Sequence, residues 1–127
     1  MGIHCQLHIK GDNAIVYSDQ GENYTPRLPT MVKEAKTIVK EHSVVFDFEL
    51  EWWKGGSHQP REITAGHFNP RSKEPVDDSE SIANVFDCLY DNEDIHNLNL
   101  SERLKRLKSF EWPQSTIGKP NLKYRFN

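Results

Sequence analysis

The stretch from Val44 to Trp53 constrains the fold most, because apolar and acidic residues alternate along it. The apolar positions are Phe46, Phe48, Leu50 and Trp52, and the acidic positions between them are Asp47, Glu49 and Glu51. A period of two residues predicts a half-buried β-strand. Because one face of such a strand is strongly apolar, it needs a covering layer, and we expect it at the centre of a sheet.

Patterning along the rest of the chain predicts both strands and helices. Alternating apolar residues predict further strands over residues 3–9, 14–18 and 122–126, with a short one at 61–64. Helical spacing, with Thr30, Ser79 and Ser101 as capping residues, predicts helices near 31–41, 80–90 and 101–110. The sequence therefore predicts an α+β fold: an antiparallel sheet of about four strands, with about three helices mainly on one face. At 127 residues, we expect residues 1–127 to form a single domain.

The last predicted strand carries basic residues where the stretch 44–53 carries acidic ones. Lys123 and Arg125 alternate with apolar residues, and opposite charges on neighbouring strands are favourable. We therefore expect this strand beside 44–53 or one strand away. The same pairing favours a solvated structural role for the three carboxylates. The alternative is a Mg²⁺ site for phosphoryl chemistry.

Composition limits the environment of the protein. No apolar run approaches the roughly 18 residues of a membrane span, so we expect a soluble cytoplasmic protein with no membrane partner. The two cysteines, Cys5 and Cys88, lie in no metal-binding or redox motif. They are interpreted as small buried residues, with a disulfide or a reactive thiol as the alternatives.

Charge is distributed unevenly along the second half of the chain. Residues 74–96 carry eight carboxylates and no Lys or Arg, whereas residues 97–127 carry seven basic and two acidic residues. The acidic segment predicts a surface that binds a basic protein partner. The predicted contact residues there are Asp77, Asp78, Glu80, Asp91, Glu93 and Asp94. The plainer alternative is a solvated segment that offsets the basic helix 101–110.

Aromatic residues in predicted loops extend this expected binding surface. Trp53 follows Trp52 directly and must face the other way on a strand. Trp112 lies between Glu111 and Pro113. Exposed Trp is enriched at binding hot spots, so Trp53, Trp112 and the nearby His58 complete the predicted partner-binding residues.

The stretch around His67 offers an enzymatic alternative. His67-Phe68-Asn69-Pro70 resembles a tetrapeptide of Cu/Zn superoxide dismutases, but the His-x-His pair of that family is absent. His67, Asn84 and His96 also resemble the His–Asn–His order of HNH nucleases, with Gly66 where that motif has Asp. This resemblance implies a metal-dependent hydrolase or nuclease, with His67 as metal ligand.

The leading functional hypothesis from sequence is a non-enzymatic protein-binding module. No convergent catalytic constellation, phosphate loop or nucleophile motif is present, so no catalytic residue, metal or cofactor is expected. A small inhibitor or an immunity or anti-defence accessory protein, of phage or mobile-element type, fits this profile. Nucleic acid is not the expected partner, and weak nucleic-acid binding through helix 101–110 is a third hypothesis.

Overall fold

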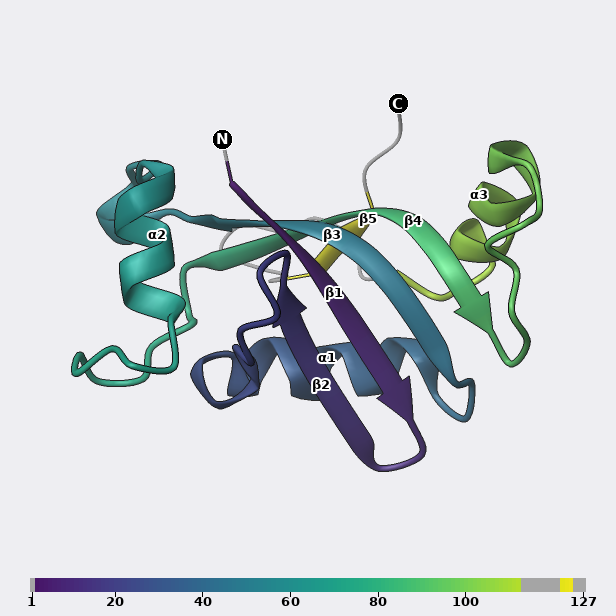
Figure 1. Ribbon diagram of the computed structural model, residues 1–127, viewed down its shortest axis with the longest axis horizontal. Coiled ribbons are helices and arrows are strands. Elements are labelled where there is room, and N and C mark those ends of the chain that lie inside the picture. The colour runs from purple at the N-terminus through teal and green to yellow at the C-terminus, as the bar shows by residue number, and fades with distance from the viewer. Residues whose placement is uncertain (1, 113–121, 125–127) are drawn as a thin grey trace.

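The computed structural model describes residues 2–112 and the backbone of residues 122–124. Its described strands form one sheet in the order β2-β1-β3-β4-β5, as Figure 1 shows. The strands are β1 (Ile3–Lys10), β2 (Asn13–Ser18), β3 (Val44–Trp52), β4 (Ser81–Asp91) and β5 (Leu122–Tyr124). The first four pair antiparallel, and β5 pairs parallel with β4. The α+β fold expected from sequence is confirmed.

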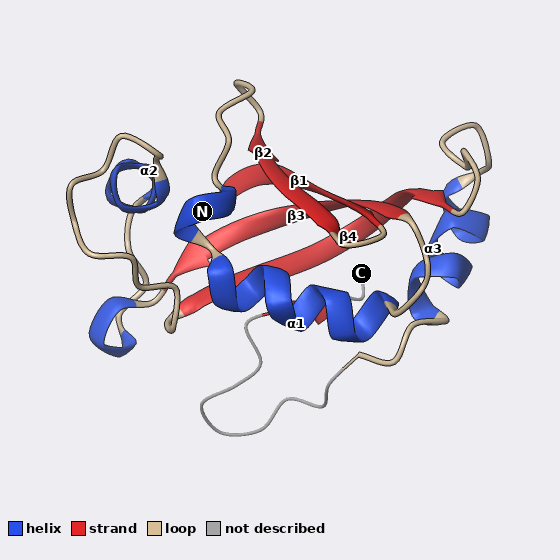
Figure 2. Ribbon diagram, turned by 90° about the horizontal axis from the view of Figure 1, so that it is seen from below, coloured by secondary structure: helices blue, strands red, loops and turns tan. Residues whose placement is uncertain are grey.

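Three α-helices and two short 3₁₀ turns accompany the sheet. The helices are α1 (Pro29–Val39), α2 (Arg61–Phe68) and α3 (Leu100–Lys108), and the turns are Thr25–Arg27 and Lys54–Gly56. Figure 2 shows α1 lying along one face of the sheet, with α2 and α3 at its two opposite ends. In the described part of the chain, no helix is long and apolar enough to cross a membrane.

The hydrophobic core lies between β3 and α1, as the alternation of β3 predicts. Phe46, Phe48 and Leu50 are fully buried, and Met31 and Ala35 of α1 are buried with them. Full burial of such side chains stabilises the fold by roughly 1.5–3 kcal/mol each. The prediction that this strand is central is confirmed, since β1 and β4 flank it.

The helix predicted near 80–90 is wrong, because these residues form β4. Two register irregularities interrupt the pairing of β4 with β3. The buried positions Ala83 and Val85 are two residues apart, whereas Cys88 comes three residues later. A β-bulge adds one residue to a strand, and the resulting mixed spacing resembles the period of a helix.

The segment 61–64, predicted as a strand, is instead the first turn of α2. The predicted helix caps are also wrong. At α1 the residue before the helix is Leu28, which makes no side-chain cap, and Pro29 is the first helical residue. The amide of Met31 instead donates to the carboxylate of the distant Asp78 at 3.0 Å. At α3 the cap is Asn99, which accepts from the amide of Glu102.

The terminal strand lies where its charge pattern placed it. Because β5 pairs with β4, it is one strand away from β3, and the prediction of its position is confirmed. The side chains of Lys123 and Arg125 lie outside the described residues, so the expected ion pairs with β3 do too.

Candidate functional site

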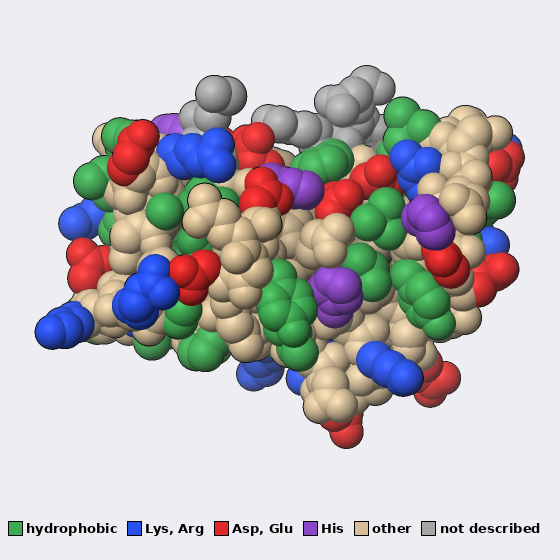
Figure 3. All heavy atoms as spheres, in the orientation of Figure 1, with side chains coloured by type: hydrophobic (Ala, Val, Ile, Leu, Met, Phe, Trp, Pro, Cys, Tyr) green, Lys and Arg blue, Asp and Glu red, His purple; other side chains and the backbone are tan. Residues whose placement is uncertain are grey.

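The face of the sheet opposite α1 carries no helix among the described residues, and we call it the open face. Outward residues of three strands make up much of its central part. Among them are His4, Gln6 and His8 of β1, Val45, Asp47, Glu49 and Glu51 of β3, and Asn84, Phe86 and Tyr90 of β4. Figure 3 looks onto this face and shows histidine and acidic side chains side by side over its middle.

His4 connects two carboxylates at the centre of the open face. Its Nδ1 lies 2.6 Å from Asp19 Oδ1, and its Nε2 lies 3.2 Å from Asp47 Oδ1. An ionised carboxylate only accepts hydrogen bonds, so a doubly protonated ring satisfies both contacts. The ring centroid of Phe86 is 5.6 Å from that of His4. An aromatic surface therefore adjoins this charged group.

Glu51 occupies the end of the open face nearest α2. His58 Nε2 lies 2.9 Å from one carboxylate oxygen, and the amide of Asn84 donates to the other. Trp53 contacts His58 edge to face at 5.0 Å and is 38% exposed. The carboxylate of Glu51 therefore has both of its oxygens occupied.

Glu49 lies between these two groups and differs from both. On the neighbouring strands it is opposite His4 and Asn84. None of the hydrogen bonds or ion pairs among the described residues involves its carboxylate. A half-buried acceptor of this kind has hydrogen-bonding capacity left for a ligand.

Gly2 fixes the backbone beside Glu49. A Cβ at this position would lie 2.2 Å from the carbonyl oxygen of Leu50 and 2.7 Å from Cγ of Glu49. Real Cβ atoms essentially never approach so closely, so only glycine lets the chain pass here without a shift. This close approach holds the start of β1 against the Glu49 region of β3.

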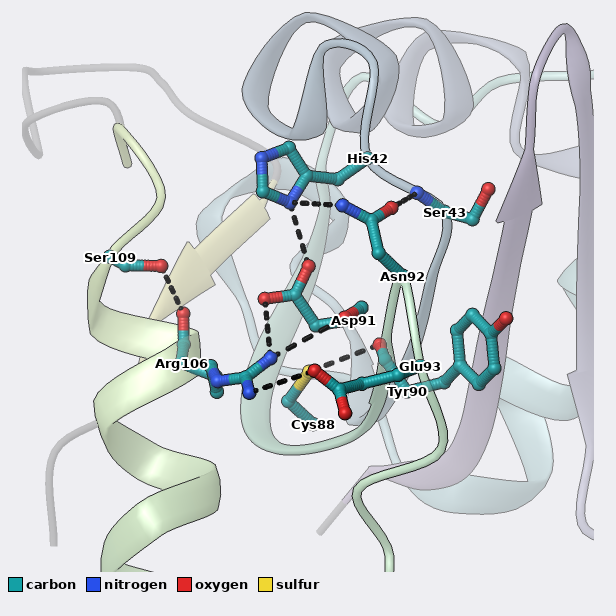
Figure 4. Close-up of polar contacts among 9 residues, drawn as sticks. All are labelled: His42, Ser43, Cys88, Tyr90, Asp91, Asn92, Glu93, Arg106 and Ser109. Atoms are coloured by element: carbon teal, nitrogen blue, oxygen red, sulfur yellow. Dashed lines mark hydrogen bonds and ion pairs between the residues drawn. The ribbon is translucent and has the colours of Figure 1, made fainter.

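The basic residues of α3 are largely used inside the protein. Arg103 forms two hydrogen bonds to Asp87, at 2.9 and 3.1 Å, and this contact raises the pKa of Arg103. Figure 4 shows the second contact, in which Arg106 reaches Asp91 at 3.4 Å and Glu93 at 3.2 Å. These contacts attach α3 to β4, so the helix offers fewer cations to a nucleic acid than its sequence implies.

The acidic segment 74–96 does not form one acidic surface, contrary to the sequence-based interpretation. Asp78 and Asp91 are buried. Asp78 caps α1, and Asp91 accepts from both His42 and Arg106. Each of the remaining predicted residues has a hydrogen-bond partner within the protein. Asp77 pairs with Ser79, Glu80 with the Gly56 amide, Glu93 with Arg106, and Asp94 with His96.

The aromatic part of the predicted partner surface is also dispersed. Trp112 is half-buried, packs against Phe46 at 5.7 Å, and donates from its indole nitrogen to the Leu107 carbonyl at 2.7 Å. Trp53 and His58 instead lie at the α2 end of the open face. The structure therefore brings together two of the predicted residues, and it adds His4, Glu49 and Phe86, which were not among the predicted partner-binding residues.

His67 does not fit the role of metal ligand. It is 5% exposed, and its ring stacks on Trp52 with centroids 3.9 Å apart. Its Nδ1 lies 2.5 Å from Glu74 Oε2, and its Nε2 lies 2.7 Å from the Asp77 carbonyl oxygen. Both nitrogens are occupied. The described residues contain no group of three or more His, Cys, Asp or Glu placed to hold a metal ion.

The two cysteines are unreactive, in agreement with the sequence-based interpretation. Both are buried and free. Burial raises the pKa of the Cys5 thiol and of the Cys88 thiol to about 12. The thiolate is the nucleophilic form of cysteine, so neither residue is a nucleophile near neutral pH.

One sequence signal could have identified the centre of the open face. The acidic alternation of β3 was visible, and the polar positions of β1 alternate in the same way. Pairing the two strands brings His4 opposite Glu49, but the register was not predicted. Phe86 was assigned to a helix, so its position beside His4 was missed.

Comparison with known proteins identifies the group to which this architecture is related. The model of the ATP dependent DNA ligase domain matches residues 2–118. A DNA ligase of Archaeoglobus fulgidus is 34% identical over 111 residues, covering 85% of this chain. A DNA ligase of Thermococcus fumicolans is 28% identical over 111 residues, covering 84% of this chain. The chain spans about a fifth of the length of these relatives, 20% in each case.

Solved structures share the fold. The ligase domain of LigD from M. tuberculosis superposes with a TM-score of 0.64 at 17% identity, covering 86% of this chain and 34% of that domain. A mycobacterial DNA ligase D complexed with ATP and MES gives the same TM-score and identity, covering 85% and 33%. At this identity, the structural likeness supports the fold.

These comparisons overturn the function predicted from sequence. The matching family and both relatives are DNA ligases. The interpretation as a non-enzymatic inhibitor or accessory module with a protein partner is therefore wrong. So is the expectation that nucleic acid is an improbable partner.

Because the family model spans most of the chain and one relative exceeds 30% identity, the chain belongs to the ATP-dependent DNA ligase domain family.

Proposed function

We propose that this chain is the part of an ATP-dependent DNA ligase that binds ATP, and that it does so at the centre of its open face. The observation that carries the proposal is that no hydrogen bond or ion pair among the described residues engages the carboxylate of Glu49. It is set between His4 and Asn84 on the neighbouring strands, and the ring of Phe86 lies 5.6 Å from that of His4. Family membership supplies the ligand class. In such a ligase, ATP provides the free energy for joining DNA ends.

The chemistry of the open face matches the sugar and base of a nucleotide. A carboxylate accepts hydrogen bonds from ribose hydroxyls or from the amino group of adenine, and Glu49 is the carboxylate with free capacity. An aromatic ring provides a stacking surface for a base, and Phe86 is half-buried at this point. The carboxylate of Glu49 and the ring of Phe86 lie on the adjacent strands β3 and β4.

The phosphates of ATP are negatively charged, so the carboxylates of β3 repel them unless a cation lies between. Mg²⁺ keeps several waters and is usually held by one or two carboxylates together with substrate phosphates. Asp47 fits this mode, which needs no three-residue cage, and this leaves Glu49 for the sugar or the base. His4 supplies positive charge beside them when both of its nitrogens are protonated.

The residues at the centre of the open face are proposed to bind ATP. Neither cysteine is available as a nucleophile, because both are buried. The described centre of the open face holds no lysine. The full joining reaction is that of the much longer relatives.

Calorimetric titration of the chain with ATP, with and without Mg²⁺, tests the proposal. Hydrogen bonds to charged groups contribute about 1.5–3 kcal/mol, so Glu49→Gln is expected to weaken ATP binding about tenfold or more. Glu41→Gln, on the exposed turn after α1, is the matched control and keeps wild-type affinity. Wild-type affinity in Glu49→Gln, or no ATP binding by the wild-type chain, contradicts the proposal.

A further inference from the structure

Three polar side chains at the α2 end of the open face hold one another in place, and we call them the Glu51 group. Glu51 belongs to β3, Asn84 to β4, and His58 to the loop after β3. One carboxylate oxygen of Glu51 accepts a hydrogen bond from Asn84 Nδ2, and the other lies 2.9 Å from His58 Nε2. Asn84 is 7% exposed, so burial and hydrogen bonding together restrict its side chain.

Glu51 determines which way the amide of Asn84 points. An ionised carboxylate only accepts hydrogen bonds, so Asn84 must direct its NH₂ group at Glu51. The oxygen Oδ1 lies on the other side of the amide carbon and is therefore directed away from Glu51. None of the hydrogen bonds among the described residues uses this oxygen as an acceptor. The amide thus has one acceptor left for a ligand.

This oxygen is turned toward the aromatic surface of the open face. Asn84 and Phe86 are two residues apart on β4, which corresponds to ~7 Å along a strand. Because β3 and β4 run antiparallel, Phe86 lies on the side of Asn84 that is away from Glu51. A base stacked on Phe86 therefore has an acceptor at its Asn84 side.

The opposite side of Phe86 offers the opposite hydrogen-bonding chemistry. The ring of His4 lies 5.6 Å from that of Phe86, and both His4 nitrogens contact carboxylates. A doubly protonated ring only donates hydrogen bonds, so it does not suit an amino group, which is also a donor. Adenine carries an amino donor at C6, where guanine carries an oxygen acceptor. The adenine amino group therefore suits the Asn84 side.

We propose that Asn84 determines the base specificity of the nucleotide site by accepting a hydrogen bond from the 6-amino group of adenine, with Glu51 as its positioning residue. The proposal rests on the proposed function, because it needs ATP on the open face with its base on Phe86. Glu49 then remains for the ribose hydroxyls. A guanine oxygen facing Asn84 Oδ1 leaves two acceptors without a donor between them, which disfavours GTP.

Purine riboside 5′-triphosphate, which lacks only the 6-amino group of ATP, tests this contact in calorimetric titrations with Mg²⁺. The wild-type chain is expected to bind ATP about tenfold more tightly than this analogue, as for a buried acceptor that loses its donor. Asn84→Leu keeps the branched shape without hydrogen-bonding groups, so its two affinities are expected to agree within about twofold. Asn84→Ala is expected to behave in the same way, and it replaces the leucine variant if thermal unfolding shows that variant to be unfolded.

Glu51→Gln tests the orientation of the Asn84 amide. Its side-chain amide can donate to Asn84 Oδ1, so the Asn84 amide can turn over and present its NH₂ group to the base. The preference for ATP over GTP is then expected to fall about tenfold, because the guanine oxygen meets a donor. A merely structural role of Glu51 would leave this preference unchanged. Glu62→Gln, exposed on α2, removes the same charge and is the matched control that keeps it.

The outcomes separate this proposal from the proposed function. The proposal is overturned if the wild-type chain binds ATP and the analogue equally, or if the Asn84 variants keep the wild-type ratio of the two affinities. An unchanged preference for ATP over GTP in Glu51→Gln overturns the positioning role of Glu51. Absence of ATP binding by the wild-type chain counts against the proposed function itself.

Discussion

Two of the histidine–carboxylate groups in this molecule, at His67 and at His4, differ in how completely their hydrogen-bonding groups are satisfied. His67 is stacked on Trp52 and bonded at both nitrogens, and Arg27 donates to its carbonyl oxygen. We call His67, Glu74, Arg27 and Trp52 the covered cluster. At the centre of the open face, His4 is also bonded at both nitrogens, but no hydrogen bond or ion pair among the described residues engages the adjacent Glu49.

The comparison shows why a histidine beside a carboxylate is a weak indicator of function. In the covered cluster no buried side-chain nitrogen or oxygen lacks a hydrogen-bond partner, as expected of buried polar groups in a stable fold. On the open face, one acceptor keeps capacity for a ligand. Changes in the covered cluster should therefore affect stability, and changes on the open face should affect binding.

The largest expected effect is on stability, from Arg27→Met in the covered cluster. Arg27 is 6% exposed and donates to the carbonyl oxygens of His67 and Glu74 at 2.8 Å each. Removing it leaves the buried carbonyl of His67 and the part-buried carbonyl of Glu74 without these donors, so we expect a loss of about 3 kcal/mol. Urea unfolding measures this loss. Lys33→Met, the same replacement on an exposed face, should change stability by less than about 0.5 kcal/mol, and equal losses in both variants would argue against the assignment.

A smaller effect is expected from Gly2→Ala, and it should appear in both stability and binding. The added Cβ meets the Leu50 carbonyl oxygen and Cγ of Glu49, and overpacking of this kind costs about 1–3 kcal/mol. Because Glu49 must move, ATP affinity should fall as well.

Gly66→Ala provides the comparison for that change. Nothing lies within 4 Å of a Cβ at Gly66, which is in α2, so alanine should stabilise the helix by about 0.5–1 kcal/mol. Thermal unfolding and ATP titration of both variants give the comparison. If the two behave alike, the close approach at Gly2 has no functional consequence.

The smallest effect is the dependence of the covered cluster on pH. The hydrogen bond to His67 lowers the pKa of Glu74 below its usual 4.5. A lowered carboxyl pKa contributes stability above the unfolded value and loses it as pH falls through the folded value. The stability difference between wild type and Glu74→Gln should therefore shrink below about pH 4.5. Urea midpoints across this range measure it, with Glu41→Gln as a control that shows no such trend.

The sequence was informative where one face of an element is apolar, and less so where the contacts are long-range. The alternation of β3 predicted the central strand, and the charges of the last strand predicted its position near β3. The bulged pairing of β4 imitated helical spacing, so a strand was interpreted as a helix. Periodicity alone does not separate these cases.

The site was harder to predict than the fold, because it depends on register. Glu49 was recognised as part of an acidic row, but the sequence does not show that Asp47 and Glu51 have partners while Glu49 has none among the described residues. That difference arises from His4 and Asn84, which are 45 and 35 residues away in the chain and meet β3 only through strand pairing. The histidine that the sequence favoured, His67, is buried by Trp52, from a different element.

The cap of α1 has a consequence for the order of folding. The helix has no capping side chain of its own, and its Met31 amide relies on Asp78, 47 residues later in the chain. A helix of eleven residues is marginal in isolation. During synthesis from the N-terminus, α1 therefore emerges before its cap exists. Its full stability arises only once the chain as far as β4 has been made.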